Sequence, residues 1–173
     1  MKRFSTTQRK GYLLIEAMVA MGVLTTGVLG IFALMSQSIK LTRVIDDQYI
    51  GTYLAAEGVE LAKNLLDANV LANPGNWNAN GFAAVNCYAL DVYTVSLAGA
   101  VGIGCPDAGS VPLKFDGTVY RYNAGTATSF TRSIRIEPIL NGGPQEGVRV
   151  VSTVKWGGGA SSVALEDKFY AWH

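Results

Sequence analysis

The sequence predicts an α+β fold, in which one long N-terminal helix packs against a C-terminal antiparallel β-sheet. Two observations predict it. The first proline is Pro74, so a helix can run unbroken through more than a third of the chain. After residue 82 the sequence changes to short runs of alternating apolar and polar residues, separated by glycine and asparagine. A length of 173 residues suits one domain with its own core.

The first element is an apolar segment, residues 12–35, whose only charged side chain is Glu16. As a helix of ~1.5 Å rise per residue it spans about 36 Å, enough to cross a hydrocarbon core of about 30 Å. The residues before it include no acid and four bases: Lys2, Arg3, Arg9 and Lys10. This basic excess predicts a cytoplasmic N-terminus, with the rest of the chain in the periplasm or outside the cell.

The second element, residues 36–72, continues the helix with an amphipathic pattern. Apolar or small residues recur at a spacing of three to four: Ile50, Leu54, Gly58, Leu61 and Leu65. The acidic residues lie mostly outside this stripe. We interpret the stripe as core packing rather than a cofactor site, and we expect one helix from about Tyr12 to about Val70.

Residues 73–173 are predicted to form a β-rich head. The turn-rich residues 73–82 (NPGNWNANGF) end the helix. Five strands are expected after them, at residues 89–97, 112–122, 129–139, 147–156 and 162–172. Glycine-rich breaks at 141–144 and 157–159 are typical of hairpin loops. The predicted head is therefore an antiparallel meander lying against the helix.

The composition argues against several functions. Net charge is +1, and beyond the first ten positions ten Lys and Arg are scattered among 13 acids, which favours no nucleic-acid-binding face. The single histidine, His173, leaves no base or ligand for a catalytic triad or a His-based metal site. Glycine-rich residues 99–104 lack the Lys-Ser/Thr ending of a phosphate loop. Asp107 and Asp116 are too isolated to argue for calcium. We expect no enzyme, no cofactor and no metal site.

The two cysteines, Cys87 and Cys105, lie in the part of the chain expected beyond the membrane, where disulfides persist. Closing the 17 residues between them would stabilise the head by about 3 kcal/mol on the chain-entropy model. The intervening stretch is rich in glycine and alanine and would otherwise be loose. We expect a disulfide; the alternative is two unpaired, buried thiols.

Three interpretations compete for the N-terminal segment. A secretory signal peptide has a shorter apolar stretch, a small-residue cleavage site after it and no internal acid. A plain single-pass anchor fits the length but leaves Glu16 unexplained, because an unpaired carboxylate facing lipid costs several kcal/mol. A third interpretation comes from residues 10–16, Lys-Gly-Tyr-Leu-Leu-Ile-Glu, which resemble the processing site of type IV prepilins and type II secretion pseudopilins.

The resemblance implies a specific set of steps and partners. A prepilin peptidase/N-methyltransferase would remove the leader, residues 1–11, by cutting after Gly11, and would methylate Tyr12. Glu16 would then be the fifth mature residue and would pair with the Tyr12 ammonium of an adjacent subunit, which sets the register of the filament-core helices. The other partners would be pilin subunits and an inner-membrane assembly platform. The chain would begin as a single-pass inner-membrane protein and end in an extracellular filament.

Two positions depart from the family pattern. Tyr12 replaces the more common phenylalanine, and Ala33 stands where many major pilins have proline. The second departure favours a minor pilin of a type IV pilus; the alternative is a pseudopilin of a type II secretion system. A membrane-anchored extracytoplasmic binding protein that never polymerises is the remaining hypothesis.

Overall fold

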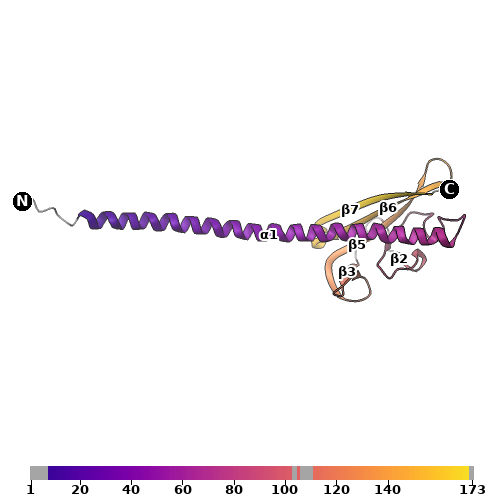
Figure 1. Ribbon diagram of the computed structural model, residues 1–173, viewed down its shortest axis with the longest axis horizontal. Helices are drawn as coiled ribbons and strands as arrows, with labels where there is room; N and C mark the ends of the chain where they lie inside the picture. The colour runs from indigo at the N-terminus through magenta and orange to yellow at the C-terminus, as the bar shows by residue number, and fades with distance from the viewer. Residues whose placement is uncertain (1–7, 103–104, 106–110, 172–173) are drawn as a thin grey trace, which may run out of the picture. The chain divides into compact units, whose positions relative to one another are not determined.

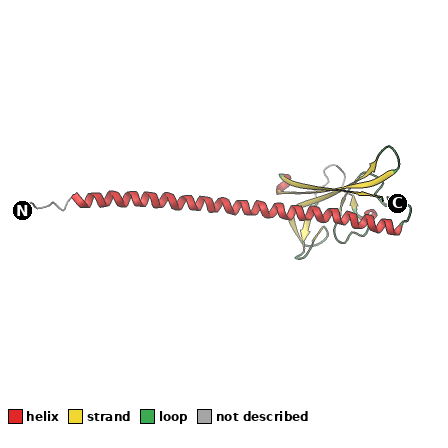
Figure 2. Ribbon diagram, turned by 45° about the horizontal axis from the view of Figure 1, so that its top comes forward, coloured by secondary structure: helices red, strands yellow, loops and turns green. Residues whose placement is uncertain are grey.

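The computed structural model describes residues 8–102, 105 and 111–171. Leader residues 1–7, with Lys2 and Arg3, lie outside this described part, as do Asp107 and His173. The helix α1 (Gln8–Ala72) runs without interruption, as predicted, and is followed by a β-rich region (Figures 1 and 2). By its contacts the chain divides into two units, which meet between Asp46 and Asp47.

In the second unit, α1 buries one face against the sheet. Leu54 and Gly58 of the predicted stripe are buried, whereas Ile50, Leu61 and Leu65 are half-buried at its margin. The buried positions recur every three to four residues, as a helix face requires: Gly51, Leu54, Ala55, Gly58, Val59, Ala62, Leu66 and Asn69. The sequence therefore predicted the correct part of the helix. It centred the buried stripe on large side chains, whereas several of the buried residues are small.

Within the described residues, seven strands form one antiparallel sheet. The strands are β1 (Asn86–Ala89), β2 (Val101–Gly102), β3 (Pro112–Phe115), β4 (Tyr120–Arg121), β5 (Thr126–Leu140), β6 (Gln145–Trp156) and β7 (Ser161–Tyr170). β5 is the hub: β6 pairs along one edge, while β3 and β1 pair with successive parts of the other. The predicted meander, in which each strand pairs with the next, is confirmed only for β5, β6 and β7. The loops between these strands include the predicted glycine-rich breaks.

Two strand predictions need correction. The expected strand 89–97 ends almost where it was expected to begin, because β1 stops at Ala89 and the Asp91 side chain organises a turn by accepting the Tyr93 N–H. The expected strand 112–122 is the hairpin of β3 and β4. Its turn is closed by Asp116, whose Oδ1 accepts the N–H groups of Val119 and Thr118. These bonds, with Arg121 nearby, lower the pKa of Asp116 to about 2.

The core lies between the second half of α1 and the helix-facing rows of β5 and β6. Ile134, Ile136, Val148 and Val150 are fully buried there, and Leu66 of α1 packs among them. A second cluster joins Leu54, Ala55, Leu113, Phe130 and Val154. Alternate residues of each strand supply this core, which is the period-two pattern used to predict the strands.

Candidate functional site

Gly11, Tyr12 and Glu16 all lie in the first turns of α1. Residues four apart on a helix occupy adjoining turns of one face, so Glu16 lies one turn beyond Tyr12 on the same side. The side chain of Tyr12 is 76% exposed, and Glu16 is exposed as well. Tyr12 and Glu16 are thus presented together on an exposed helix face.

The helix around Glu16 offers it no partner. Among the described residues Glu16 takes part in no ion pair. Its neighbours Ile15, Val19 and Leu13 are apolar and more than half exposed. α1 is long and apolar enough to cross a membrane, judged by length and composition. In a membrane, an unpaired carboxylate within such an apolar segment would be costly.

Large apolar side chains remain exposed well beyond residue 35. A ridge with a four-residue spacing continues along α1, and each of its members is 56–61% exposed: Leu41, Ile45, Tyr49 and Tyr53. We call these four residues the exposed ridge. From Tyr12 to Ile45, within the first unit, the helix measures about 51 Å, which exceeds the ~30 Å thickness of a hydrocarbon core. A bilayer can therefore cover only part of the apolar surface of α1.

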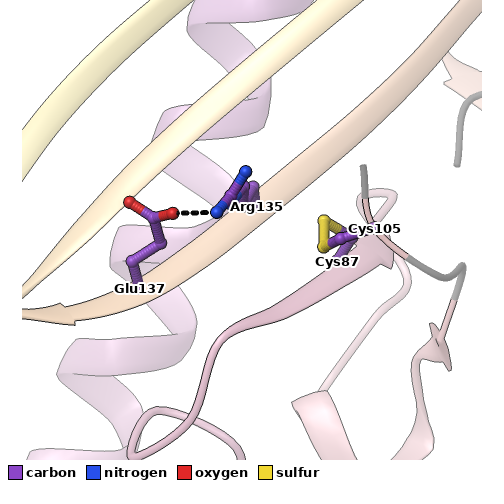
Figure 3. The surroundings of a disulfide bond; sticks show 4 residues. All are labelled: Cys87, Cys105, Arg135 and Glu137. Atoms are coloured by element: carbon purple, nitrogen blue, oxygen red, sulfur yellow. Dashed lines mark ion pairs between the residues drawn. A yellow bond between two sulfur atoms is a disulfide. The ribbon is translucent and has the colours of Figure 1, made fainter. Parts of the chain in front are cut away.

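The predicted disulfide between Cys87 and Cys105 is confirmed (Figure 3). Cys87 is buried in β1 and lies in register with Arg135 of β5, which forms an ion pair with Glu137. Cys105 is exposed. The bond therefore ties the exposed Cys105 to β1, which lies between β2 and β5 in the sheet.

Removing this disulfide should destabilise the head by about 3 kcal/mol, because the unfolded chain regains the freedom of the closed loop. The change is Cys87→Ala with Cys105→Ala, measured by urea unfolding of the full chain in detergent micelles. Reducing the wild-type protein with dithiothreitol should give the same shift and should leave the double variant unchanged. Equal midpoints for the oxidised and reduced wild-type protein would contradict this expectation.

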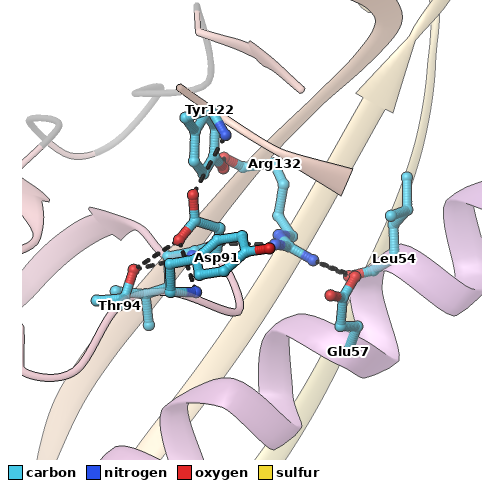
Figure 4. A network of polar contacts seen from close by, with 8 residues as sticks. Leu54, Glu57, Asp91, Thr94, Tyr122 and Arg132 are labelled. Atoms are coloured by element: carbon cyan, nitrogen blue, oxygen red, sulfur yellow. Dashed lines mark hydrogen bonds and ion pairs between the residues drawn. The ribbon is translucent and has the colours of Figure 1, made fainter. Parts of the chain in front are cut away.

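A buried arginine joins three parts of the second unit (Figure 4). The side chain of Arg132, on β5, is 0% exposed. Its Nη1 donates to the Leu54 carbonyl (3.0 Å) and to Glu57 Oε2 (2.9 Å), both on α1. Its Nη2 donates to the Leu90 carbonyl (2.7 Å), just after β1. One guanidinium thus links the helix, β5 and the segment after β1.

Neighbouring polar groups extend this network. The Tyr122 hydroxyl donates to the Arg132 carbonyl (2.9 Å), and the Tyr122 N–H donates to Asp91 Oδ2 (3.2 Å). Burial raises the pKa of the Tyr122 phenol. The sequence prediction missed this network, although one signal was present: Arg132 has the same strand parity as the buried Ile134 and Ile136. The geometry is that of a structural clamp.

The end of α1 has a second polar hub, which the sequence prediction also missed. Asn69 is only 7% exposed, and its Nδ2 donates to the carbonyls of Trp77 (2.7 Å) and Ala79 (3.1 Å). Its Oδ1 accepts the amides of Asn73 and Asn80. A buried side chain that satisfies four partners orders the turn-rich segment 73–82.

Within the described part of the chain, no three His, Cys, Asp or Glu residues are grouped as a metal site would need. Asp116, considered for calcium, instead pairs with Arg121 and closes the β3–β4 turn.

The comparisons with known proteins assign no family. No protein-family model matches the chain, and neither a curated protein nor a solved structure matches it. The functional argument therefore depends on the residues and their geometry.

Proposed function

We propose that this chain is a filament subunit, most similar to a minor pilin of a type IV pilus, that is cut after Gly11 and assembled through α1. The observation that carries the proposal is that Glu16, which forms no ion pair with the described residues, lies one helical turn beyond Tyr12. Cutting after Gly11 creates an ammonium at Tyr12, the counter-charge that Glu16 lacks among the residues that the structure describes. A neighbouring subunit supplies that ammonium in a low-dielectric setting, where pairing is the main way a charge is tolerated.

The exposed ridge favours assembly over a plain membrane anchor. A single-pass anchor needs about 20 apolar residues, whereas Leu41, Ile45, Tyr49 and Tyr53 extend the apolar surface of α1 further. Contiguous exposed apolar surface in an aqueous compartment marks an interaction site. Packing α1 helices side by side covers both the apolar segment 12–35 and the ridge. A type II secretion pseudopilin would use the same contacts, and Ala33 is compatible with either assembly.

Mass spectrometry of the purified chain tests the processing step. In cells that contain a prepilin peptidase, we expect a mature chain that begins at N-methylated Tyr12. Replacing Gly11 with Ala should leave the full-length precursor, because the peptidase no longer finds its glycine. A mature wild-type chain that keeps residues 1–11 would refute the proposal and favour a membrane-anchored binding protein.

Replacing Glu16 with Ala tests the assembly step. The variant should be cleaved and methylated normally but should be absent from sheared filaments, because its register contact is missing. Immunoblots of membrane and sheared fractions measure this. The matched control is Asp46→Ala, which removes another exposed acid of α1 and should leave incorporation unchanged. Efficient incorporation of the Glu16→Ala variant into filaments would contradict the assembly role proposed for Glu16.

A further inference from the structure

The outer edge of β7 is open. Among the residues that the structure describes, β6 is the only strand that pairs with β7. The Ala171 N–H, next along the chain, donates to the Glu146 carbonyl (2.9 Å). Hydrogen bonding alternates along an antiparallel pair, so the N–H groups of Tyr170, Lys168 and Glu166 point away from β6. They form a row of backbone groups that another strand can join.

A groove of about 600 Å³ lies beside this edge, between the last turns of α1 and the end of β7. Residues 167–171 line it consecutively, so both faces of the strand border it and the groove follows the strand edge. Its apolar lining comes from Leu66, Val70, Trp77 and Phe169. The volume is in the range of ligand-binding clefts, and the lining suits one large apolar side chain.

Three charges at this groove have no ion-pair partner. Lys63 and Asp67 lie one turn apart on α1, and Asp167 lies on β7. In the described part of the chain none of the three takes part in an ion pair. Lys168 also lines the groove, but it forms an ion pair with Glu166. The remaining two carboxylates and one ammonium sum to a charge of −1, which favours a base.

Asp167 also interrupts an apolar row. It lies in register with the buried Val150, between Leu165 and Phe169 on the helix-facing side of β7. Its Oδ1 accepts the N–H of Lys168 (2.8 Å), one of the groups that point out of the sheet. Asp167 is exposed, and a charge on an edge strand discourages indiscriminate pairing. The Asp167 carboxylate already accepts the Lys168 N–H, which is the donor that an added strand would use.

We propose that this groove binds an extended polypeptide segment that adds to the edge of β7 and carries an apolar and a basic residue two positions apart. Phe169 and Asp167 are themselves two residues apart, about 7 Å along a strand, so the segment matches that spacing. A carbonyl of the segment accepts the Lys168 N–H and releases Asp167. The freed carboxylate, with Asp67, then pairs with the basic side chain. This mode of recognition is β-strand addition.

The other candidate occupant is a second copy of β7. Antiparallel pairing of two β7 edges around Asp167 would set the two carboxylates opposite each other, which is destabilising, but it would also set Glu166 opposite Lys168, so sedimentation of the wild-type chain distinguishes this occupant. The inference goes beyond the proposed filament role, because binding of a segment here requires neither cleavage after Gly11 nor assembly.

Fluorescence anisotropy of a labelled peptide tests the proposal with the full chain in detergent micelles. The probe is acetyl-Ser-Thr-Phe-Thr-Lys-Thr-Ser-amide. One matched peptide has Glu in place of Lys, and another has Pro in place of the central Thr. We expect saturable binding of the probe, at least fivefold weaker binding of the Glu peptide, since a charge pair contributes about 1 kcal/mol, and no binding of the Pro peptide. Equal affinity for all three peptides, or no saturable binding, would overturn the proposal.

Variants locate the site. Asp167→Lys should reverse the preference, so that the Glu peptide binds more tightly than the Lys peptide. Asp167→Asn should abolish the preference without reversing it, and intact tryptophan fluorescence will show that both variants fold. The control Glu60→Lys changes an exposed acid of α1 outside the groove and should preserve the wild-type order. If Asp167→Lys keeps that order, or if sedimentation shows wild-type chains pairing through β7, the proposed occupant is wrong.

Discussion

Replacing Arg132 with Met should destabilise the head by about 3 kcal/mol, because one partner of a buried ion pair is removed. The change strips the Leu90 carbonyl and Glu57 of the charge-assisted bonds that join three chain segments. The side chain of Glu57 is 31% exposed and can be hydrated. The expected loss of stability is therefore at the lower end of the range for a broken buried ion pair. Urea unfolding of the full chain in micelles, followed by tryptophan fluorescence, measures it.

The matched control is Arg135→Met, on the same strand. Arg135 points to the other face of β5, where its side chain is 43% exposed and pairs with Glu137. Glu137 is 17% exposed but keeps its second partner, Arg149, and an exposed arginine contributes at most about 1 kcal/mol through such a pair, so this variant should unfold close to the wild-type midpoint. If both variants lose similar stability, the burial of Arg132 adds nothing to the stability of the head. That result would contradict the structural role proposed for Arg132.

Replacing Gly58 with Ala should also destabilise the head, by about 2 kcal/mol, although alanine is intrinsically the better helix former. A Cβ at this position would overlap Ser152 Oγ and would lie 3.1 Å from Ser152 Cβ and 3.2 Å from Arg132 Cδ. The helix meets β6 too closely here for a methyl group. The same unfolding measurement applies.

Two companion variants identify the cause. Gly27→Ala, where an added Cβ meets nothing within 4 Å, should leave unfolding of the head unchanged. Ser152→Ala removes a buried hydroxyl that has no hydrogen-bond partner in the described part of the chain and should be nearly neutral alone. Combined with Gly58→Ala it should recover about 1 kcal/mol, a coupling typical of residues in contact. Strict additivity would mean that the overlap with Ser152 is not the cause.

The sequence predicted those parts of the fold that follow from local pattern. The proline-free stretch predicted α1, and alternation in residues 131–136 and 148–156 predicted β5 and β6, because helix and strand periods are properties of neighbouring residues. It could not predict that β1 stops at Ala89, because a side chain at Asp91 and its turn partners decide this. Nor could it predict that β5 pairs with both β1 and β3 along one edge, which depends on contacts between distant segments.

The candidate site divides in the same way. The roles proposed for Gly11, Tyr12 and Glu16 come from a motif with fixed spacing along the sequence, and they stay a prediction. The disulfide could be anticipated from the number of cysteines but not from any distance. The Arg132 clamp was missed because an arginine in an alternating strand is normally assigned to the solvent side. The partners that make its burial tolerable come from positions 42 and 75–78 residues away.

Because the chain is synthesised from its N-terminus, the buried face of α1 is made before the strands that cover it. Leu66 leaves the ribosome 150 − 66 = 84 residues before Val150, a strand residue that packs in the same cluster. At a synthesis rate of roughly 5–20 residues per second, the apolar face of the helix stays exposed for about 4–17 s. During that interval its apolar stripe is open to chaperones and to the membrane surface. Translation speed between residues 66 and 150 therefore sets how long the nascent chain is vulnerable to aggregation.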